Sequence, residues 1–116
     1  MSLEMKRVNV RASLKAVEDT AITAAVAKQE AIGLRAASDG EYRRAYWHYD
    51  FVGGLDGVEI YEPEQKIQFK GSVPPLGHAL RVNKRISWNR PVMIDHYQFL
   101  ASKVKTAVAK QTIPSP

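Results

Sequence analysis

Cysteine is absent from this 116-residue sequence. Its absence excludes disulfide scaffolds, Cys-based zinc sites and cysteine nucleophiles. It also fits the reducing cytosol, so we expect a cytoplasmic protein. Long apolar runs are lacking too, because the longest, AITAAVA at 21–27, is too short to cross a bilayer. The first residues, MSLEMKRVNV, have no apolar segment of a secretory signal. We therefore expect no membrane partner.

Acidic residues are missing from one long stretch, Gln65 to Ile94. The net charge is +5, and its excess is uneven along the chain. Residues 56–116 carry nine basic and five acidic side chains, a net of +4, whereas residues 1–55 carry eight and seven, a net of +1. A modest basic excess of this kind favours anionic partners electrostatically.

Known catalytic and metal-binding patterns are also lacking. The three histidines, His48, His78 and His96, form neither an i, i+4 pair nor an HExxH motif. The glycine-rich VGGLDG at 52–57 lacks the spacing of a phosphate-binding loop, and no serine stands in a G-x-S-x-G context. We therefore expect no enzyme activity, no catalytic residues, no cofactor and no metal.

The length predicts one domain, residues 1–116, with a single core. Its first helix is predicted from Ser13 to about Ala37, and Gly33 is expected to break or cap it near its end. The apolar stripe of this helix would comprise Leu14, Val17, Ala21 and Ala25.

A second helix is predicted from the capping-box pattern Ser38-Asp39-Gly40-Glu41, with its end at Gly53-Gly54. Its segment RRAYWHYDF is rich in the residue types that dominate interface hot spots. The interface candidates are Tyr46, Trp47 and Phe51. The alternative is that these aromatic residues belong to the core.

After the glycines the apolar period changes from 3.6 to 2, which predicts strands. A hairpin is expected around Pro63-Glu64-Gln65, followed by a third strand from His78 to Trp88. The core side of that strand would carry Leu80, Val82, Ile86 and Trp88, with a bulge near Asn83-Lys84. A long helix is then predicted from Pro91 to about Gln111.

The fold class predicted is α+β, a small antiparallel sheet of three, possibly four, strands. Two N-terminal helices and one long C-terminal helix would cover one face. The helical half spans about 12–52, the hairpin and third strand about 57–88, and the C-terminal helix about 91–111. The possible fourth strand comes from Val8 and Val10, which alternate with polar residues.

The polar faces of these strands would together form a basic surface. Cations neutralise phosphates and amides can contact base edges, so nucleic acid is a possible partner. The candidates are Arg7, Asn9, Arg11, Lys66, Lys70, Arg81, Asn83 and Arg85. The alternative is a solvated sheet face whose basic residues guard its edges.

The segment KRVNVRASLKAVEDTAI resembles the opening of the ribbon-helix-helix DNA-binding proteins. In that family a short strand with alternating polar residues enters the major groove and a helix follows. The resemblance covers roughly the first 50 residues and implies groove contacts by Arg7, Asn9 and Arg11. The tight turn between helices is replaced here by IGLRAASDG.

Two functions follow as hypotheses. The leading one is a non-catalytic interaction or assembly protein, homo-oligomeric or a small component of a larger complex. The alternative is a nucleic-acid-binding protein that uses the basic sheet face or the N-terminal segment.

Overall fold

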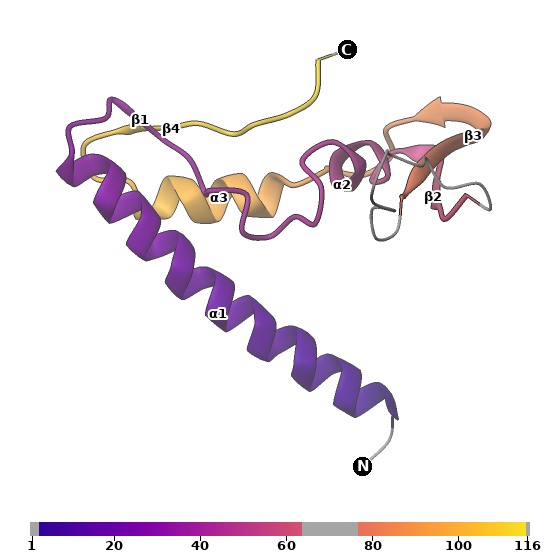
Figure 1. The fold of residues 1–116 in the computed structure, drawn as a ribbon, viewed down its shortest axis with the longest axis horizontal. Helices are drawn as coiled ribbons and strands as arrows, with labels where there is room; N and C mark the ends of the chain where they lie inside the picture. Colours follow the sequence, from indigo (N-terminus) through magenta and orange to yellow (C-terminus); the bar gives the residue numbers. More distant parts are fainter. Residues whose placement is uncertain (1–2, 64–76, 116) are drawn as a thin grey trace, which may run out of the picture. The chain divides into compact units, whose positions relative to one another are not determined.

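The structure, a computed structural model, describes residues 3–63 and 77–115, with side chains from Asn9 onward. The chain divides into two compact units (Figure 1). Unit 1 comprises Met1–Ala45 and Met93–Thr112, and unit 2 comprises Tyr46–Val92 and Ile113–Pro116. No helix in the described part of the chain is both long and apolar enough to cross a membrane.

Helix α1 spans Leu3–Ala31 and opens unit 1. The predicted helix from Ser13 is confirmed, but it begins ten residues earlier. The possible strand at 7–11 is wrong, because those residues are helical. A lone strand there would leave its backbone groups unpaired, whereas a helix satisfies them within the segment. The ribbon that the ribbon-helix-helix resemblance requires is therefore not formed.

Gly33 ends α1, as predicted, but the helix stops six residues before the expected Ala37. The Gly33 N–H donates to the Glu30 carbonyl at 3.0 Å, and the Leu34 N–H donates to the Gln29 carbonyl at 3.1 Å. These two bonds define a Schellman motif, which needs a left-handed residue after the helix. Gly33 supplies it with φ of 85°.

Two short strands, β1 (Ala36–Ala37) and β4 (Val108–Ala109), form a parallel pair in unit 1. Ala36 pairs with Val108 and Ala37 with Ala109. Parallel pairing was not predicted, and the long C-terminal helix 91–111 is wrong. Helix α3 covers only Ile94–Lys103.

The reason for the early end of α3 lies on α1. The Glu30 Oε1 atom accepts the backbone N–H groups of Lys105, Thr106 and Ala107 at 2.7, 2.7 and 2.9 Å. Those N–H groups would otherwise continue the helix. These bonds lower the pKa of Glu30 from 4.5 to about 2, the one from Ala107 contributing most.

The core of unit 1 joins both helices to one face of the parallel pair. Its fully buried members are Ile22, Val26, Ala37 and Leu100. The other face of the pair is open, since Ala36 is exposed and Val108 is 71% exposed. Parallel sheets are normally covered on both faces. Unit 1 therefore covers only one face of its parallel pair.

Unit 2 contains α2 (Tyr49–Val52) and an antiparallel pair, β2 (Asp56–Tyr61) with β3 (Ala79–Ser87). The predicted third strand is confirmed, and it pairs directly with β2. A register irregularity between Asp56 and Val58 lies opposite the expected bulge in β3. The second strand of the predicted hairpin falls outside the described residues.

Two predictions for unit 2 are wrong. The intended core side of β3 is exposed, because Val82 is 61%, Ile86 48% and Trp88 69% accessible. The predicted helix from residue 38 to 52 is reduced to the four residues of α2. Across the described residues the α+β class holds, with three helices and two small sheets, one parallel and one antiparallel.

Candidate ligand site at the carboxyl ends of the parallel strands

The carboxyl ends of β1 and β4 lie side by side. The pairing continues one residue beyond the strands, where the Lys110 N–H donates to the Ala37 carbonyl at 2.9 Å. Two residues past the last registered pair, Asp39 and Gln111 occupy equivalent positions on the two chains. In open parallel sheets, ligands bind outside the carboxyl ends of the strands. This edge is therefore the candidate site.

A strained turn follows β1. The Ser38 Oγ atom accepts the Gly40 N–H at 3.3 Å, and Asp39 Oδ1 accepts the Glu41 N–H at 3.0 Å. In both bonds the donor N–H belongs to the residue two positions ahead of the acceptor side chain. In a capping box the donor lies three positions ahead, so the predicted helix start is wrong. Glu41 has φ of 59°, which is uncommon for a residue with a side chain. Strain of this kind is concentrated at functional sites.

Buried polar atoms without partners gather at the same edge. Asp39 is 1% exposed, and its Oδ2 atom has no hydrogen-bond partner. The amide oxygen and nitrogen of Gln111 are also buried and unpaired. An unsatisfied buried polar group costs about 1–3 kcal/mol, and more when it is charged. Native proteins rarely leave such groups unused.

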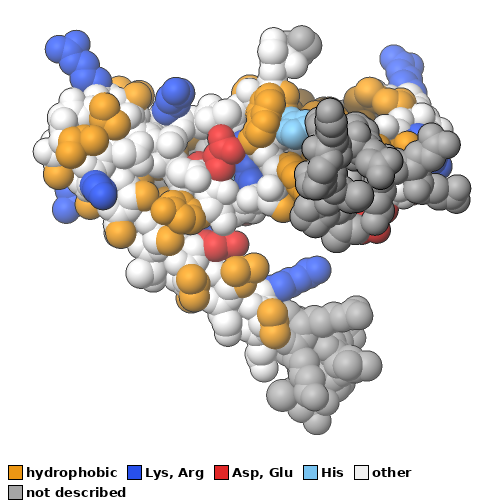
Figure 2. Space-filling view, viewed as in Figure 1, with side chains coloured by type: hydrophobic (Ala, Val, Ile, Leu, Met, Phe, Trp, Pro, Cys, Tyr) orange, Lys and Arg blue, Asp and Glu red, His pale blue; other side chains and the backbone are white. Residues whose placement is uncertain are grey.

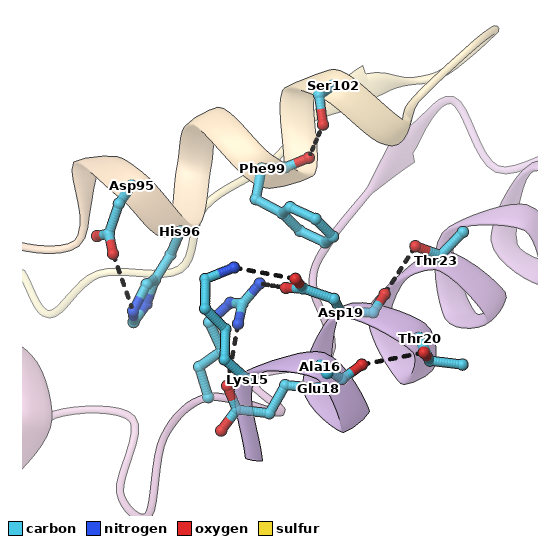
Figure 3. Close-up of polar contacts among 11 residues, drawn as sticks. Lys15, Ala16, Glu18, Asp19, Thr20, Thr23, Asp95, His96, Phe99 and Ser102 are labelled. Carbon is cyan, nitrogen blue, oxygen red and sulfur yellow. Dashed lines mark hydrogen bonds and ion pairs between the residues drawn. The ribbon is translucent and has the colours of Figure 1, made fainter. Parts of the chain in front are cut away.

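Arg43 anchors the residues after this turn to α1. Its side chain is 6% exposed, and Nη1 donates to Glu18 Oε2 at 2.9 Å, while Nη2 contacts Asp19 Oδ1. Lys15 Nζ lies 2.9 Å from the other oxygen of Asp19. Figure 3 shows these α1 side chains facing Phe99 of α3. Hydrogen bonds from Arg43, then from Lys15, lower the pKa of Asp19.

Phe99 is surrounded by cations. Arg43, Lys103 and Lys15 lie 4.8, 5.0 and 5.5 Å from the ring centroid. Two open pockets of about 510 and 540 Å³ share Phe99 in their walls. Carboxylates from Glu18, Asp19 and Asp95 also line these pockets, so the charges are balanced. We interpret this cluster as an anchor for the turn.

The predicted interface residues lie in unit 2. Tyr46 is 37% and Trp47 48% exposed, and Phe51 is half-buried in α2. The Tyr46 ring contacts those of Tyr49 and His78, with centroids 5.4 and 5.3 Å apart. Tyr46 and Trp47 precede α2, so they form a turn cluster and do not share a helical face.

The described candidates for the predicted basic surface lie on α1 of unit 1 and on β3 of unit 2. Asn9 and Arg11 are exposed on α1, while Arg81, Asn83 and Arg85 are exposed on β3. The Arg7 side chain, Lys66 and Lys70 lie outside the description. The Arg81 guanidinium lies 4.3 Å from the centroid of the Tyr61 ring, and Arg81 is opposite Glu59 in the strand register.

The residues of the carboxyl edge were missed by sequence reasoning. Asp39 was assigned to a helix cap and Gln111 to the end of a helix. The one local signal was Gly40, because glycine readily adopts the left-handed conformation of a turn. Arg43 pairs with carboxylates 24 and 25 positions away, which no local pattern reveals. Within residues 3–63 and 77–115, no three His, Asp or Glu side chains gather closely enough to hold a metal ion.

Two curated relatives share most of the chain. The uncharacterized proteins YxjG and YxjH of Bacillus subtilis (strain 168) are 43% and 41% identical to it over 103 residues. The match covers 89% of this chain and 27% of each relative. The chain thus spans about a quarter of the length of these relatives. No family model matches the sequence.

A solved structure is similar in both fold and sequence. It is the crystal structure of a Listeria monocytogenes protein described, provisionally, as a vitamin-B12 independent methionine synthase. The TM-score is 0.64 and the sequence identity 33%, over 87% of this chain and 26% of that one. The chain is therefore similar to about a quarter of the Listeria protein.

Proposed function

We propose that this chain works as one segment of a larger protein or complex related to the Listeria vitamin-B12 independent methionine synthase. The observation that carries the proposal is the partial match, which includes most of this chain but 26% of the Listeria chain. The proposal keeps the expectation of a component in a larger assembly. In it, the carboxyl edge of β1 and β4 forms part of a ligand site.

The exposed apolar residues of unit 1 support this proposal. Val10, Leu14 and Val17 on α1 are 66%, 56% and 67% exposed. Figure 2 shows hydrophobic side chains along this helix. Their spacing of four and three places them on one face, away from the buried Ile22 and Val26. These side chains and the open face of the parallel pair form exposed apolar surface. Surface of this kind marks contacts with other protein segments.

We propose further that the chain has no catalytic activity by itself. The carboxyl edge offers a carboxylate, an amide and the Arg44 guanidinium, which donates to the Thr112 carbonyl, but no recognisable nucleophile or proton-transfer pair among the described residues. Methionine synthesis in this proposal belongs to the larger protein, to which the chain contributes binding groups.

A chimaera tests the proposal. The matched segment of the Listeria protein is replaced by this chain, and methionine formation is measured without vitamin B12. We expect a folded and active chimaera, since the identity over this segment is 33%. A chimaera lacking Asp39 and Gln111 side chains (Asp39→Ala with Gln111→Ala) serves as the matched control. A folded but inactive chimaera, from an active parent, would contradict the proposal.

Self-association through the aromatic cluster is the second candidate function. The observation that favours it is the exposure of Tyr46 and Trp47, with Phe51 half-buried beside them in the sequence. Aromatic side chains supply large contact areas at low entropic cost. The nucleic-acid alternative draws its support from the exposed Arg81, Asn83 and Arg85 on β3.

A further inference from the structure

We propose that the bulge of β3 docks an acidic, extended segment of a partner protein. The residues that bind are Lys84, Arg85, Ile86 and Trp88, which we call the bulge surface. The inference lies entirely in unit 2 and does not depend on the relation to methionine synthesis. It gives this surface a protein partner, where the nucleic-acid alternative gives it a phosphate backbone.

The bulge is large, and a glycine permits it. The registered pairs on its two sides are Val58–Val82 and Asp56–Ser87. Residues 83–86 of β3 therefore lie opposite Gly57 alone. Gly57 has φ of 90°, and a Cβ added there would lie 2.7 and 2.8 Å from the carbonyl oxygens of Arg85 and Lys84. A bulge interrupts the ladder and changes where its side chains point, often beside a functional site.

The two cations of the bulge surface have no acidic partner within the described part of the chain. Lys84 and Arg85 are both exposed, and neither belongs to an ion pair among residues 3–63 and 77–115. The sequence has no acidic residue from Gln65 to Ile94. Arg81 differs, since Glu59 lies opposite it in the register. Carboxylates supplied by a partner therefore complement this surface.

Large apolar side chains lie beside these cations. Val82, Ile86 and Trp88 are 61%, 48% and 69% exposed. Residues 84–88 span at most about 17 Å of extended chain, so one short partner segment reaches all of them. Single exposed apolar side chains are common on protein surfaces. A group that includes tryptophan and arginine is typical of an interface with another protein.

The aliphatic side chains favour a protein over a nucleic acid. Phosphate contacts require cations, and base stacking requires an aromatic ring such as that of Trp88. Val82 and Ile86 contribute to neither kind of contact. A segment in which acidic and apolar residues are interleaved offers carboxylates and apolar side chains within the same short length. Its extended backbone can also hydrogen bond along a strand.

Fluorescence anisotropy with the whole 116-residue chain tests the proposal. The probe is a short labelled peptide in which glutamate alternates with leucine and valine. Two matched peptides carry serine in place of the apolar residues, or lysine in place of glutamate. We expect saturable binding of the first peptide, binding at least about tenfold weaker for the serine peptide, and none for the lysine peptide. No saturable binding of the first peptide, or equal binding of the serine peptide, would overturn the proposal.

Combined Lys84→Glu and Arg85→Glu is the informative variant, because both residues are exposed and their backbone is unchanged. We expect binding at least about tenfold weaker, since attraction is replaced by repulsion. Combined Lys28→Glu and Lys110→Glu, which changes the net charge equally on exposed lysines of unit 1, is the matched control and should leave binding unchanged. Equal weakening by both double variants would indicate general charge attraction and overturn the bulge surface.

Trp88→Ala isolates the apolar contribution, and its exposure means that the fold does not depend on it. We expect about tenfold weaker binding of the first peptide. Unchanged binding would remove Trp88 from the surface and contradict the proposal. Single-stranded DNA is measured in the same assay. Tighter binding of DNA than of the first peptide would overturn the proposal in favour of nucleic acid. Methionine formation is not a readout here, so the proposed function and the bulge surface fail separately.

Discussion

At the scale of single residues, Arg43 connects three parts of unit 1. It follows the strained turn by two residues, pairs with two carboxylates of α1 and stacks on Phe99 of α3. The nearly complete burial of its side chain means that neither water nor a mobile lysine can replace it without loss. Arg43 therefore fixes where the carboxyl-edge turn lies relative to the helices.

We expect Arg43→Ala to lower the free energy of unfolding, because it leaves Glu18 without its cation and Asp19 with Lys15 alone. Lys15→Ala is the matched control, because it also removes a cation from Asp19. The Lys15 side chain is 62% exposed. That exposed i, i+4 pair is screened by solvent, so we expect its loss to matter much less. Urea unfolding followed by circular dichroism measures both. Similar losses in the two variants would refute the anchoring role.

Glu30 makes the free energy of unfolding depend on pH in the acidic range. Its folded pKa is lowered to about 2 from 4.5 by three backbone N–H bonds, led by that of Ala107. A depressed carboxyl pKa contributes stability that is complete above the unfolded value and is lost as pH falls through the folded value. The relevant window therefore runs from about pH 5 down to about pH 2.

We expect Glu30→Gln to lower the melting temperature at pH 7, because a neutral amide oxygen accepts the three N–H groups less strongly than a carboxylate. The difference from the unaltered chain should shrink steadily as the pH is lowered through this window. Thermal unfolding at pH 7, 4 and 2.5 measures it. A difference that stays constant with pH would show that the Glu30 charge is not the cause.

At the scale of elements, the β2–β3 pair depends on close approach at Gly57. Its φ is 90°, and an added Cβ would lie 2.7 and 2.8 Å from the carbonyl oxygens of Arg85 and Lys84. Both the backbone conformation and the space therefore require glycine at this position.

We expect Gly57→Ala to destabilise unit 2 by about 2 kcal/mol or more, the cost of a left-handed alanine plus a backbone clash. Gly77→Ala is the control, because its Cβ would meet nothing within 4 Å. Amide hydrogen exchange of β2 and β3 reports the change locally. Unaltered protection in Gly57→Ala would contradict the described pairing.

Elements governed by local patterns were predictable, and those governed by distant partners were not. The centre of α1, its stop at Gly33 and strand β3 follow from periodicity and glycine chemistry. Residues 108–109 have the composition of a helix, yet they pair with β1 because Glu30 holds the preceding N–H groups. The side chains of Ser38 and Asp39 can accept a backbone N–H from two residues ahead, as in a turn, or from three residues ahead, as in a helix cap. The left-handed conformation of Glu41 favours the turn. Nothing in the local sequence indicates that choice.

At the scale of the whole molecule, several large apolar side chains are exposed, Trp47 among them. We expect the isolated chain to self-associate through Trp47 when no larger protein is present. Light scattering after size exclusion should show oligomers that Trp47→Ala reduces toward monomer. Val82→Ala, which removes another exposed apolar side chain of unit 2, is the control. A monomer at high concentration would count against self-association.

The nucleic-acid alternative makes a separate prediction at this scale. Combined Arg81→Glu and Arg85→Glu should abolish binding that weakens steeply with salt, because phosphate contacts release counterions. Fluorescence anisotropy with single- and double-stranded probes at low salt measures it. Combined Lys28→Glu and Lys110→Glu, which reverses two exposed lysines of unit 1, serves as the control for net charge. No binding by the unaltered chain at low salt would end this hypothesis.

The division of unit 1 into two sequence segments sets an order of events during synthesis. Residues 46–92, the larger part of unit 2, are made before residues 93–112, which complete unit 1. At roughly 5–20 residues per second, the N–H groups of 105–107 follow Ala45 by about 3–12 s. Throughout that interval the Glu30 carboxylate lacks the three donors it later binds, and β1 lacks β4. A nascent α1 therefore lacks these stabilising contacts until residues 105–109 have been made.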